Sequence, residues 1–189
     1  MKKDYAMKNK HNFMWVGAFA FVLSLLLPAC KTEEVDTSKV EKLEAQMKEL
    51  TINGAMASPD QMKQVARELG AAYEEVAGKL PEDDARVSAF LYHAAENYEL
   101  LPDGLDKAIS LYDRVQKNYP ASEEAALALF NQGFIYNNNL LDTARARRVY
   151  TEFIQRFPAH ELADDADFEI KTLGLSPDSL LKDPIDKEE

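Results

Sequence analysis

Few side chains of this sequence could perform acid–base or nucleophilic chemistry. After residue 30 it holds two histidines, His93 and His160, and no cysteine. His93 falls within an apolar helical pattern and is expected to be packed or solvated, whereas His160 follows Pro158 and can cap the next helix. No glycine-rich phosphate loop is present. The sequence therefore predicts no catalytic residue, no enzyme and no small-molecule substrate.

One group of carboxylates could attract a metal ion. It consists of Asp164, Asp165 and Asp167, which could bind Ca²⁺ weakly. Acidic residues at the start of a helix are also stabilised by the helix dipole, and we favour that interpretation. No other stretch has the spacing of metal ligands. We therefore expect no metal and no cofactor.

The single cysteine follows an N-terminal targeting pattern. Lysines precede an apolar run over residues 13–27, and Leu27-Pro28-Ala29-Cys30 follows. The run is too short for a spanning helix and ends at small residues, as a secretory signal does. The pattern resembles the lipobox of bacterial lipoproteins, which implies removal of residues 1–29 and anchoring to the membrane through an acylated Cys30. The alternative is an uncleaved anchor with an incidental thiol.

Residues 30–37 are expected to be a polar tether. Position 31 is Lys rather than the Asp that retains enteric lipoproteins at the inner membrane, so the resemblance implies a lipid anchor in the outer membrane. Lys31, Glu33 and Glu34 are similar to the export signal of surface lipoproteins in some Gram-negative bacteria, but they also suit an ordinary linker. Attachment at the periplasmic face and display on the cell surface therefore both stay open.

The chain beyond the signal is strongly acidic. Residues 1–29 hold four of the 22 Lys and Arg and one of the 33 Asp and Glu, so the remainder carries a net charge of −14. Such a surface repels nucleic acid and anionic lipid headgroups. We therefore expect no nucleic-acid partner.

Residues 85–158 contain an internal repeat with a period of 38. The identical pairs are Leu91 and Leu129, Tyr98 and Tyr136, Ala108 and Ala146, Tyr112 and Tyr150, and Pro120 and Pro158. Apolar residues within each unit are spaced by three and four, which indicates two helices per unit. A fixed period in this range is typical of stacked supersecondary units.

The residue types within each unit predict how its helices pack. Ala95 and Gly133 are small residues in the first helix, where they allow close approach of a second helix. Each unit ends at a proline, which cannot continue a helix. Together the signature residues resemble the tetratricopeptide repeat, although the usual period is 34. The full signature is Ala95, Tyr98, Ala108, Tyr112 and Pro120, then Gly133, Tyr136, Ala146, Tyr150 and Pro158.

The resemblance implies an all-α fold, a right-handed stack of helix-turn-helix repeats over residues 59–176. Two units are clear, at about 85–120 and 122–158, and degenerate units flank them. Residues 125–136 are apolar almost all round, which places their helix at the centre of the stack. Residues 161–173 begin a third unit, and residues 177–189 are expected to form a capping helix and a charged tail.

Residues 38–58 are expected to form a short helix and a loop. Apolar residues are spaced by three and four, at Val40, Leu43, Met47 and Leu50. This spacing suits a helix that docks on the repeats, or a short coiled coil that joins two chains. The next helix is expected to begin with a capping box at Ser58 and Gln61. Ser122 is likewise expected to cap the first helix of the second unit.

The first helices of such repeats form the main binding groove in the family that this chain resembles. Transferred onto this chain, the groove consists of Tyr92, Glu96, Glu99, Phe130, Phe134, Asn137 and Asn138. Tyr92 and Phe130 could equally belong to the core, whereas Phe134 is expected to be exposed. Acids, aromatic rings and amides would suit a basic or neutral peptide.

These features favour a non-enzymatic scaffold that is anchored to the membrane and binds an envelope protein or peptide. In style the chain is similar to the repeat lipoprotein of the β-barrel assembly machinery and to the repeat domain of the Tol–Pal coordinator, so outer-membrane protein assembly and envelope maintenance are the roles implied. Alternatives are a self-associating spacer, a surface lipoprotein that captures ligands, and a hydrolase that uses two facing carboxylates.

Overall fold

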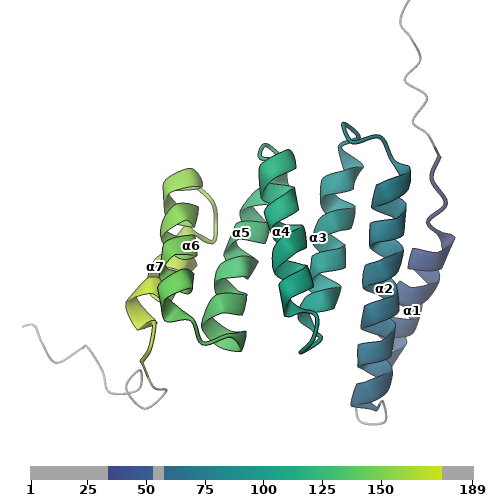
Figure 1. Ribbon diagram of the computed structural model, residues 1–189, viewed down its shortest axis with the longest axis horizontal. Coiled ribbons are helices and arrows are strands. Elements are labelled where there is room, and N and C mark those ends of the chain that lie inside the picture. Colours follow the sequence, from purple (N-terminus) through teal and green to yellow (C-terminus); the bar gives the residue numbers. More distant parts are fainter. Residues whose placement is uncertain (1–33, 53–57, 176–189) are drawn as a thin grey trace, which may run out of the picture. The chain divides into compact units, whose positions relative to one another are not determined.

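The computed structural model describes residues 34–52 and 58–175, which contain helices and no strand (Figure 1). The elements are α1 (Ser38–Ile52), α2 (Pro59–Lys79), α3 (Arg86–Glu99), α4 (Leu105–Asn118), α5 (Glu123–Phe134), the π-helical segment η2 (Ile135–Asn139), α6 (Thr143–Arg156) and α7 (Ala163–Thr172). Each helix packs mainly against its neighbours in the chain, and α3 also touches α5. The prediction of an all-α stack of helices is confirmed.

Several expectations concern residues outside the part that the structure describes. They are the signal over 1–29, the lipidation site Cys30, most of the tether, the loop around residues 53–57, and the capping helix and tail over 177–189. The chain divides into two units, Met1–Glu34 and Val35–Glu189, and all the helices described here belong to the second.

Helix α1 docks on α2. Val40 and Leu43 are buried, and Met47 and Leu50 pack against the same core. An ion pair of 3.2 Å joins Lys39 on α1 to Glu75 on α2. The docking alternative is therefore confirmed, and the apolar side of α1 that a coiled coil would need is already occupied within the chain.

The start of α2 follows its predicted capping chemistry. The Ser58 side chain accepts a hydrogen bond from the backbone N–H of Gln61, and the Gln61 side chain accepts one from the backbone N–H of Ser58. Pro59 occupies the first helical turn, where its missing N–H costs nothing. The capping box thus sets where α2 begins after the α1–α2 connection.

Helix α5 lies between two clusters of the apolar core. Ala128 belongs to a cluster that extends from α1 to α5, whereas Ala126 and Leu129 belong to a second cluster with α6 and α7. Side chains on several sides of α5 are therefore buried, as its nearly continuous apolar sequence predicts.

The second helix of each clear repeat inserts a buried tyrosine beside small residues of the stack. Tyr112 and Tyr150 are fully buried, as are Ala95, Ala108 and Ala146. A Cβ atom added to Gly133 would lie only 2.7–2.9 Å from ring atoms of Tyr150. Gly133 is thus the position that lets α5 and α6 approach this closely.

The remaining signature residues lie at the margins of the repeats. Tyr98 and Tyr136 are half-buried, and each has a cation above its ring, Lys107 at 5.9 Å and Arg145 at 4.7 Å from the ring centroid. Pro120 and Pro158 follow the ends of α4 and α6 and are exposed.

The segment η2 accommodates an extra residue at the end of the first helix of the second unit. Its wider turn is closed by a hydrogen bond of 3.0 Å from the N–H of Leu140 to the carbonyl oxygen of Ile135, five residues earlier. Leu141 then has a positive φ of 55°, uncommon for a residue with a side chain. Because an offset of 38 already relates Leu91 to Leu129 before this turn, η2 does not account for the difference from the usual period of 34.

The expected side-chain cap at Ser122 is wrong. Ser122 occupies the N-cap position of α5, but its hydroxyl oxygen is buried and makes no hydrogen bond within the described residues. Glu123 and Glu124 in the first turn still complement the helix dipole. His160 behaves as expected, since its Nδ1 accepts a hydrogen bond of 3.1 Å from the N–H of Leu162, just before α7.

We predict that Gly133→Ala destabilises the chain by about 1–3 kcal/mol, because the new methyl group collides with the buried ring of Tyr150. Gly78→Ala in α2 is the matched control. No atom lies within 4 Å of a Cβ there, so the control should gain about 0.5–1 kcal/mol from helix propensity. Urea unfolding measures both, and equal stability of the two variants would contradict the proposed close approach.

Candidate protein-binding surface

Successive first helices present one side chain each toward the tyrosine of the preceding second helix. Sequence spacing of 38 relates these first-helix residues, which are His93 on α3, Asn131 on α5 and Glu169 on α7. The corresponding tyrosines are Tyr73 on α2, Tyr112 on α4 and Tyr150 on α6. The same junction between helices therefore occurs three times with different polar partners.

The middle junction is fully hydrogen-bonded. The Tyr112 hydroxyl donates to Glu99 Oε2 at 3.0 Å and accepts from Asn131 Nδ2 at 3.2 Å. Asn131 Nδ2 also donates to the Tyr92 hydroxyl at 3.0 Å. Burial raises the pKa of the Glu99 carboxyl, the hydrogen bond from Tyr112 lowers it, and the charge of Glu96 raises it again, with a net increase.

The first junction combines a carboxylate with an imidazole. The Tyr73 hydroxyl donates to Glu44 Oε1, and its ring centroid lies 5.4 Å from that of His93. His93 Nδ1 is 2.8 Å from Glu96 Oε2. This hydrogen bond raises the pKa of the His93 imidazole, although burial opposes the increase.

The third junction exchanges the acid and the amide. Asn137 takes the place of Glu99, Glu169 takes the place of Asn131, and Asn137 Nδ2 donates to Glu169 Oε2 at 2.9 Å. The buried hydroxyl of Tyr150 has no hydrogen-bond partner among the described residues. Burial and then the charges of Glu169 and Glu99 raise the pKa of Tyr150.

Within the predicted groove, Tyr92 and Phe130 contribute mainly to packing. Tyr92 is only 8% exposed. Phe130 is half-buried, and its ring centroid lies 5.4 Å from that of Tyr150 and 5.6 Å from that of Phe153. These two rings therefore contribute to helix packing more than to an open surface.

The other predicted groove residues are accessible to different degrees. Glu96, Glu99 and Asn137 are half-buried, whereas Phe134 is 42% exposed. Asn138 is exposed, and its Nδ2 donates to the carbonyl oxygen of Phe134 at 3.3 Å. That these side chains bind a partner stays a prediction.

Sequence reasoning missed the row formed by His93, Asn131 and Glu169, and also Glu44. The offset of 38 could have identified the row, because the three residues occupy one position in successive first helices. Glu44 carries no such signal, since α1 and α2 do not follow the same period.

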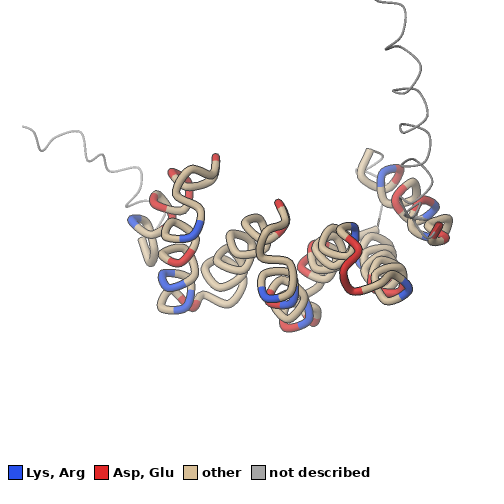
Figure 2. The backbone as a smooth tube through the Cα atoms, turned by 90° about the horizontal axis from the view of Figure 1, so that it is seen from above, with Lys and Arg blue, Asp and Glu red and all other residues tan. Residues whose placement is uncertain are grey.

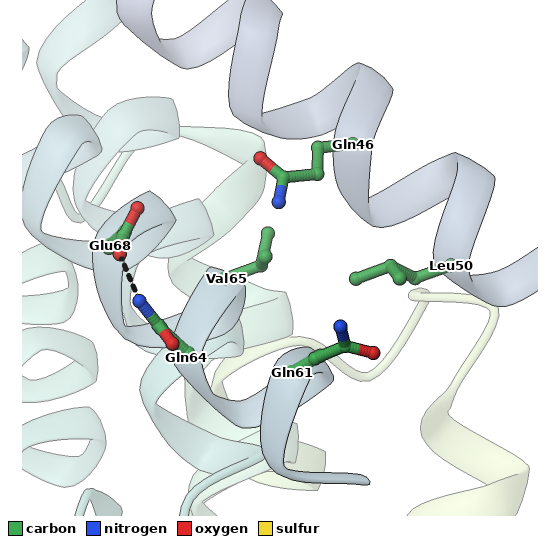
Figure 3. A pocket seen from close by; sticks show the side chains of 6 residues that line it. All are labelled: Gln46, Leu50, Gln61, Gln64, Val65 and Glu68. Atoms are coloured by element: carbon green, nitrogen blue, oxygen red, sulfur yellow. Dashed lines mark hydrogen bonds between the residues drawn. The ribbon is translucent and has the colours of Figure 1, made fainter. Parts of the chain in front are cut away.

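Neither of two hollows in the described part of the chain is lined by a catalytic arrangement of side chains. One of about 230 Å³ lies between α1 and α2 and is lined largely by amides, with Glu68 accepting a hydrogen bond of 3.0 Å from Gln64 (Figure 3). The other, of about 520 Å³, lies beside α7. Among residues 34–52 and 58–175, no three His, Cys, Asp or Glu side chains gather as metal ligands would.

Within the same residues, every helix is too short or too polar to span a membrane.

Comparison with known families identifies two tetratricopeptide repeats in this chain, over residues 89–122 and 127–160. The two matches begin 38 residues apart, in agreement with the internal repeat. No curated protein matches the chain. Tetratricopeptide repeats generally act as non-catalytic scaffolds that bind protein partners, so the chain contains a fold suited to protein–protein interaction.

We predict that Glu99→Gln makes stability less dependent on pH. The pKa of Glu99 is higher in the folded chain, so the folded state binds the proton more tightly than the unfolded state does. The free energy of unfolding therefore falls as pH rises from about 4.3, the ordinary pKa of Glu, through the raised pKa. Gln keeps an oxygen that accepts the Tyr112 hydrogen bond but cannot ionise. The variant should therefore be more stable than the parent at neutral pH, by a margin that shrinks on acidification.

Urea unfolding between pH 4 and 8 measures this difference. Glu82→Gln, in the exposed turn before α3, controls for the loss of one negative charge. A constant difference between Glu99→Gln and the parent across this range would show that Glu99 does not titrate as described.

Proposed function

We propose that this chain is a lipid-anchored, non-enzymatic scaffold of the bacterial envelope that binds a basic or neutral segment of a partner protein along its first helices. The observation that carries the proposal is the junction between a second helix and the next first helix, which occurs three times, at α3, α5 and α7. It places carboxylates and amides in a row beside exposed aromatic surface, on a fold whose general role is to bind proteins.

Charge favours a basic segment. Glu96 and Glu99 are half-buried on α3, and Glu169 is half-buried on α7. A Lys or Arg side chain brought to these carboxylates gains charge-assisted hydrogen bonds in a partly desolvated site. Phe134 and Asn138, at the open side of α5 and η2, supply an aromatic contact and an amide for the backbone of the segment.

The membrane anchor in this proposal is Cys30. It follows a short apolar run and small residues in the manner of a lipobox. Acyl chains on this residue would hold the acidic scaffold at a membrane that its own charge repels. The resemblance to outer-membrane lipoproteins favours a place there, in outer-membrane protein assembly or envelope maintenance, and surface display for ligand capture is the alternative orientation.

A photo-reactive phenylalanine analogue at position 134 is expected to crosslink the partner in intact cells. The same analogue at Leu100, an apolar position in the turn between α3 and α4 that is more exposed than Phe134, is the control and should give no such product. Phe134→Ala should reduce recovery of the partner several-fold, because a partly buried aromatic contact is lost. Identical crosslinking at both positions, or none at 134, would argue against this surface.

Cys30→Ser is expected to release the protein from membranes. Wild-type protein should incorporate an alkyne-labelled fatty acid and sediment with the outer membrane, whereas the variant should do neither. A variant that still sediments would indicate an uncleaved N-terminal anchor. Protease treatment of intact and lysed cells then reports orientation, since peptides lost from intact cells would mean surface display.

A further inference from the structure

Helix α7 leaves an apolar face uncovered in the described residues. Phe168 is 60% exposed and Leu141 is 78% exposed, and with Leu175 they line the hollow of about 520 Å³. Asn137 and Glu169 form its polar side. A hollow with both an apolar rim and a carboxylate is a candidate docking site.

The two preceding repeats show what covers this position. Phe168 is related by the period of 38 to Phe130, whose ring lies 5.4 Å from that of Tyr150 on the second helix of the same unit. Tyr92, one unit earlier, lies 5.7 Å from the ring of Tyr112 on its second helix. In the described chain no second helix follows α7. The face around Phe168 therefore has the chemistry of a first helix whose second helix is absent from the described residues.

Charge indicates which kind of helix would fit. Among its charged residues α6 has four arginines and one glutamate, and α4 has three basic and two acidic residues. Helix α5, by contrast, has two glutamates and no basic residue, and α7 has four acidic residues and one lysine (Figure 2). Second helices of the matched repeats are thus basic and first helices acidic, so a helix complementary to α7 is basic.

Neither the C-terminal residues nor a second copy suits this face. Residues 176–189 carry five acidic residues and two lysines, and position 184, equivalent to Ala108 and Ala146, is a proline. At the other end of the stack, the apolar side of α1 is already packed against α2, and its remaining residues are mostly polar. The candidate occupant is therefore a basic helix of a partner protein.

We propose that the face of α7 around Phe168 binds a basic amphipathic helix of a partner protein, which takes the place of the second helix of the third repeat. The site centres on Phe168 rather than on the peptide-binding surface of α3 and α5, and Asn138 and Glu169 belong to both. The partner helix needs a small residue followed four positions later by an aromatic one, as in Ala146 and Tyr150 of α6.

A synthetic peptide of residues 142–158, the chain's own α6 sequence, serves as the probe. With a fluorescent label it should give saturable anisotropy on titration with the full-length protein. Phe168→Ser should weaken binding about tenfold or more, because the central aromatic contact is lost. Leu100→Ser, which removes an equally exposed apolar side chain from the turn after α3, should leave binding unchanged. Circular dichroism confirms that both variants remain folded.

Three outcomes would overturn the proposal. The first is no binding by the probe, or equal binding by wild type and Phe168→Ser, as expected if the peptide merely displaced α6. The second is binding only after deletion of residues 176–189, which would identify those residues as the cover. The third is self-association in light scattering that Phe168→Ser abolishes, which would identify a second copy. Phe134→Ala tests the peptide-binding row separately.

Discussion

The stack depends on burying one tyrosine at each junction between a second helix and the next first helix. The rings of Tyr112 and Tyr150 are fully enclosed, and Gly133 has no room for even one methyl group beside Tyr150. A buried hydroxyl without a partner costs about 1–3 kcal/mol. A polar side chain of the next first helix accordingly lies at each of the three junctions, and these are His93, Asn131 and Glu169.

The three junctions differ in the polar partners that they give the buried tyrosine hydroxyl. These differences indicate which polar side chains the fold requires. Asn131 and Glu99 satisfy the hydroxyl of Tyr112 together, whereas Asn137 and Glu169 bond to each other and leave that of Tyr150 without a partner. The fold thus tolerates an acid or an amide on either side of the junction. Burial raises the pKa of the Glu99 carboxyl, and helix packing does not require this side chain to be charged. Perturbed acids that the fold does not need are typical of functional surfaces.

Sequence periodicity predicts most of the fold, because the period of 38 marks both helices of each unit, their small contacts and their closing prolines. It could not predict that Ser122 leaves its hydroxyl unpaired, since the surrounding burial depends on contacts distant in the chain. Nor could it place Glu44 against Tyr73, because α1 and α2 lie outside the regular period. Among the predicted groove residues, Tyr92 is buried in the core, whereas Phe134 on the following first helix is exposed. Sequence alone could not make this distinction, because it depends on which side each helix turns toward its neighbour.

Net charge alternates between the acidic first helices and the basic second helices of the two matched repeats. Side-chain hydrogen bonds join these helices, from Gln132 on α5 to Asp113 on α4 and from Arg156 on α6 to Gln116 on α4. At α7 the alternation stops within the described chain, and acid and aromatic surface remain together around Phe168. Within the described residues α7 is a first helix that no second helix covers. In our proposal it selects a partner helix by basic charge and by the shape that packs against Phe168.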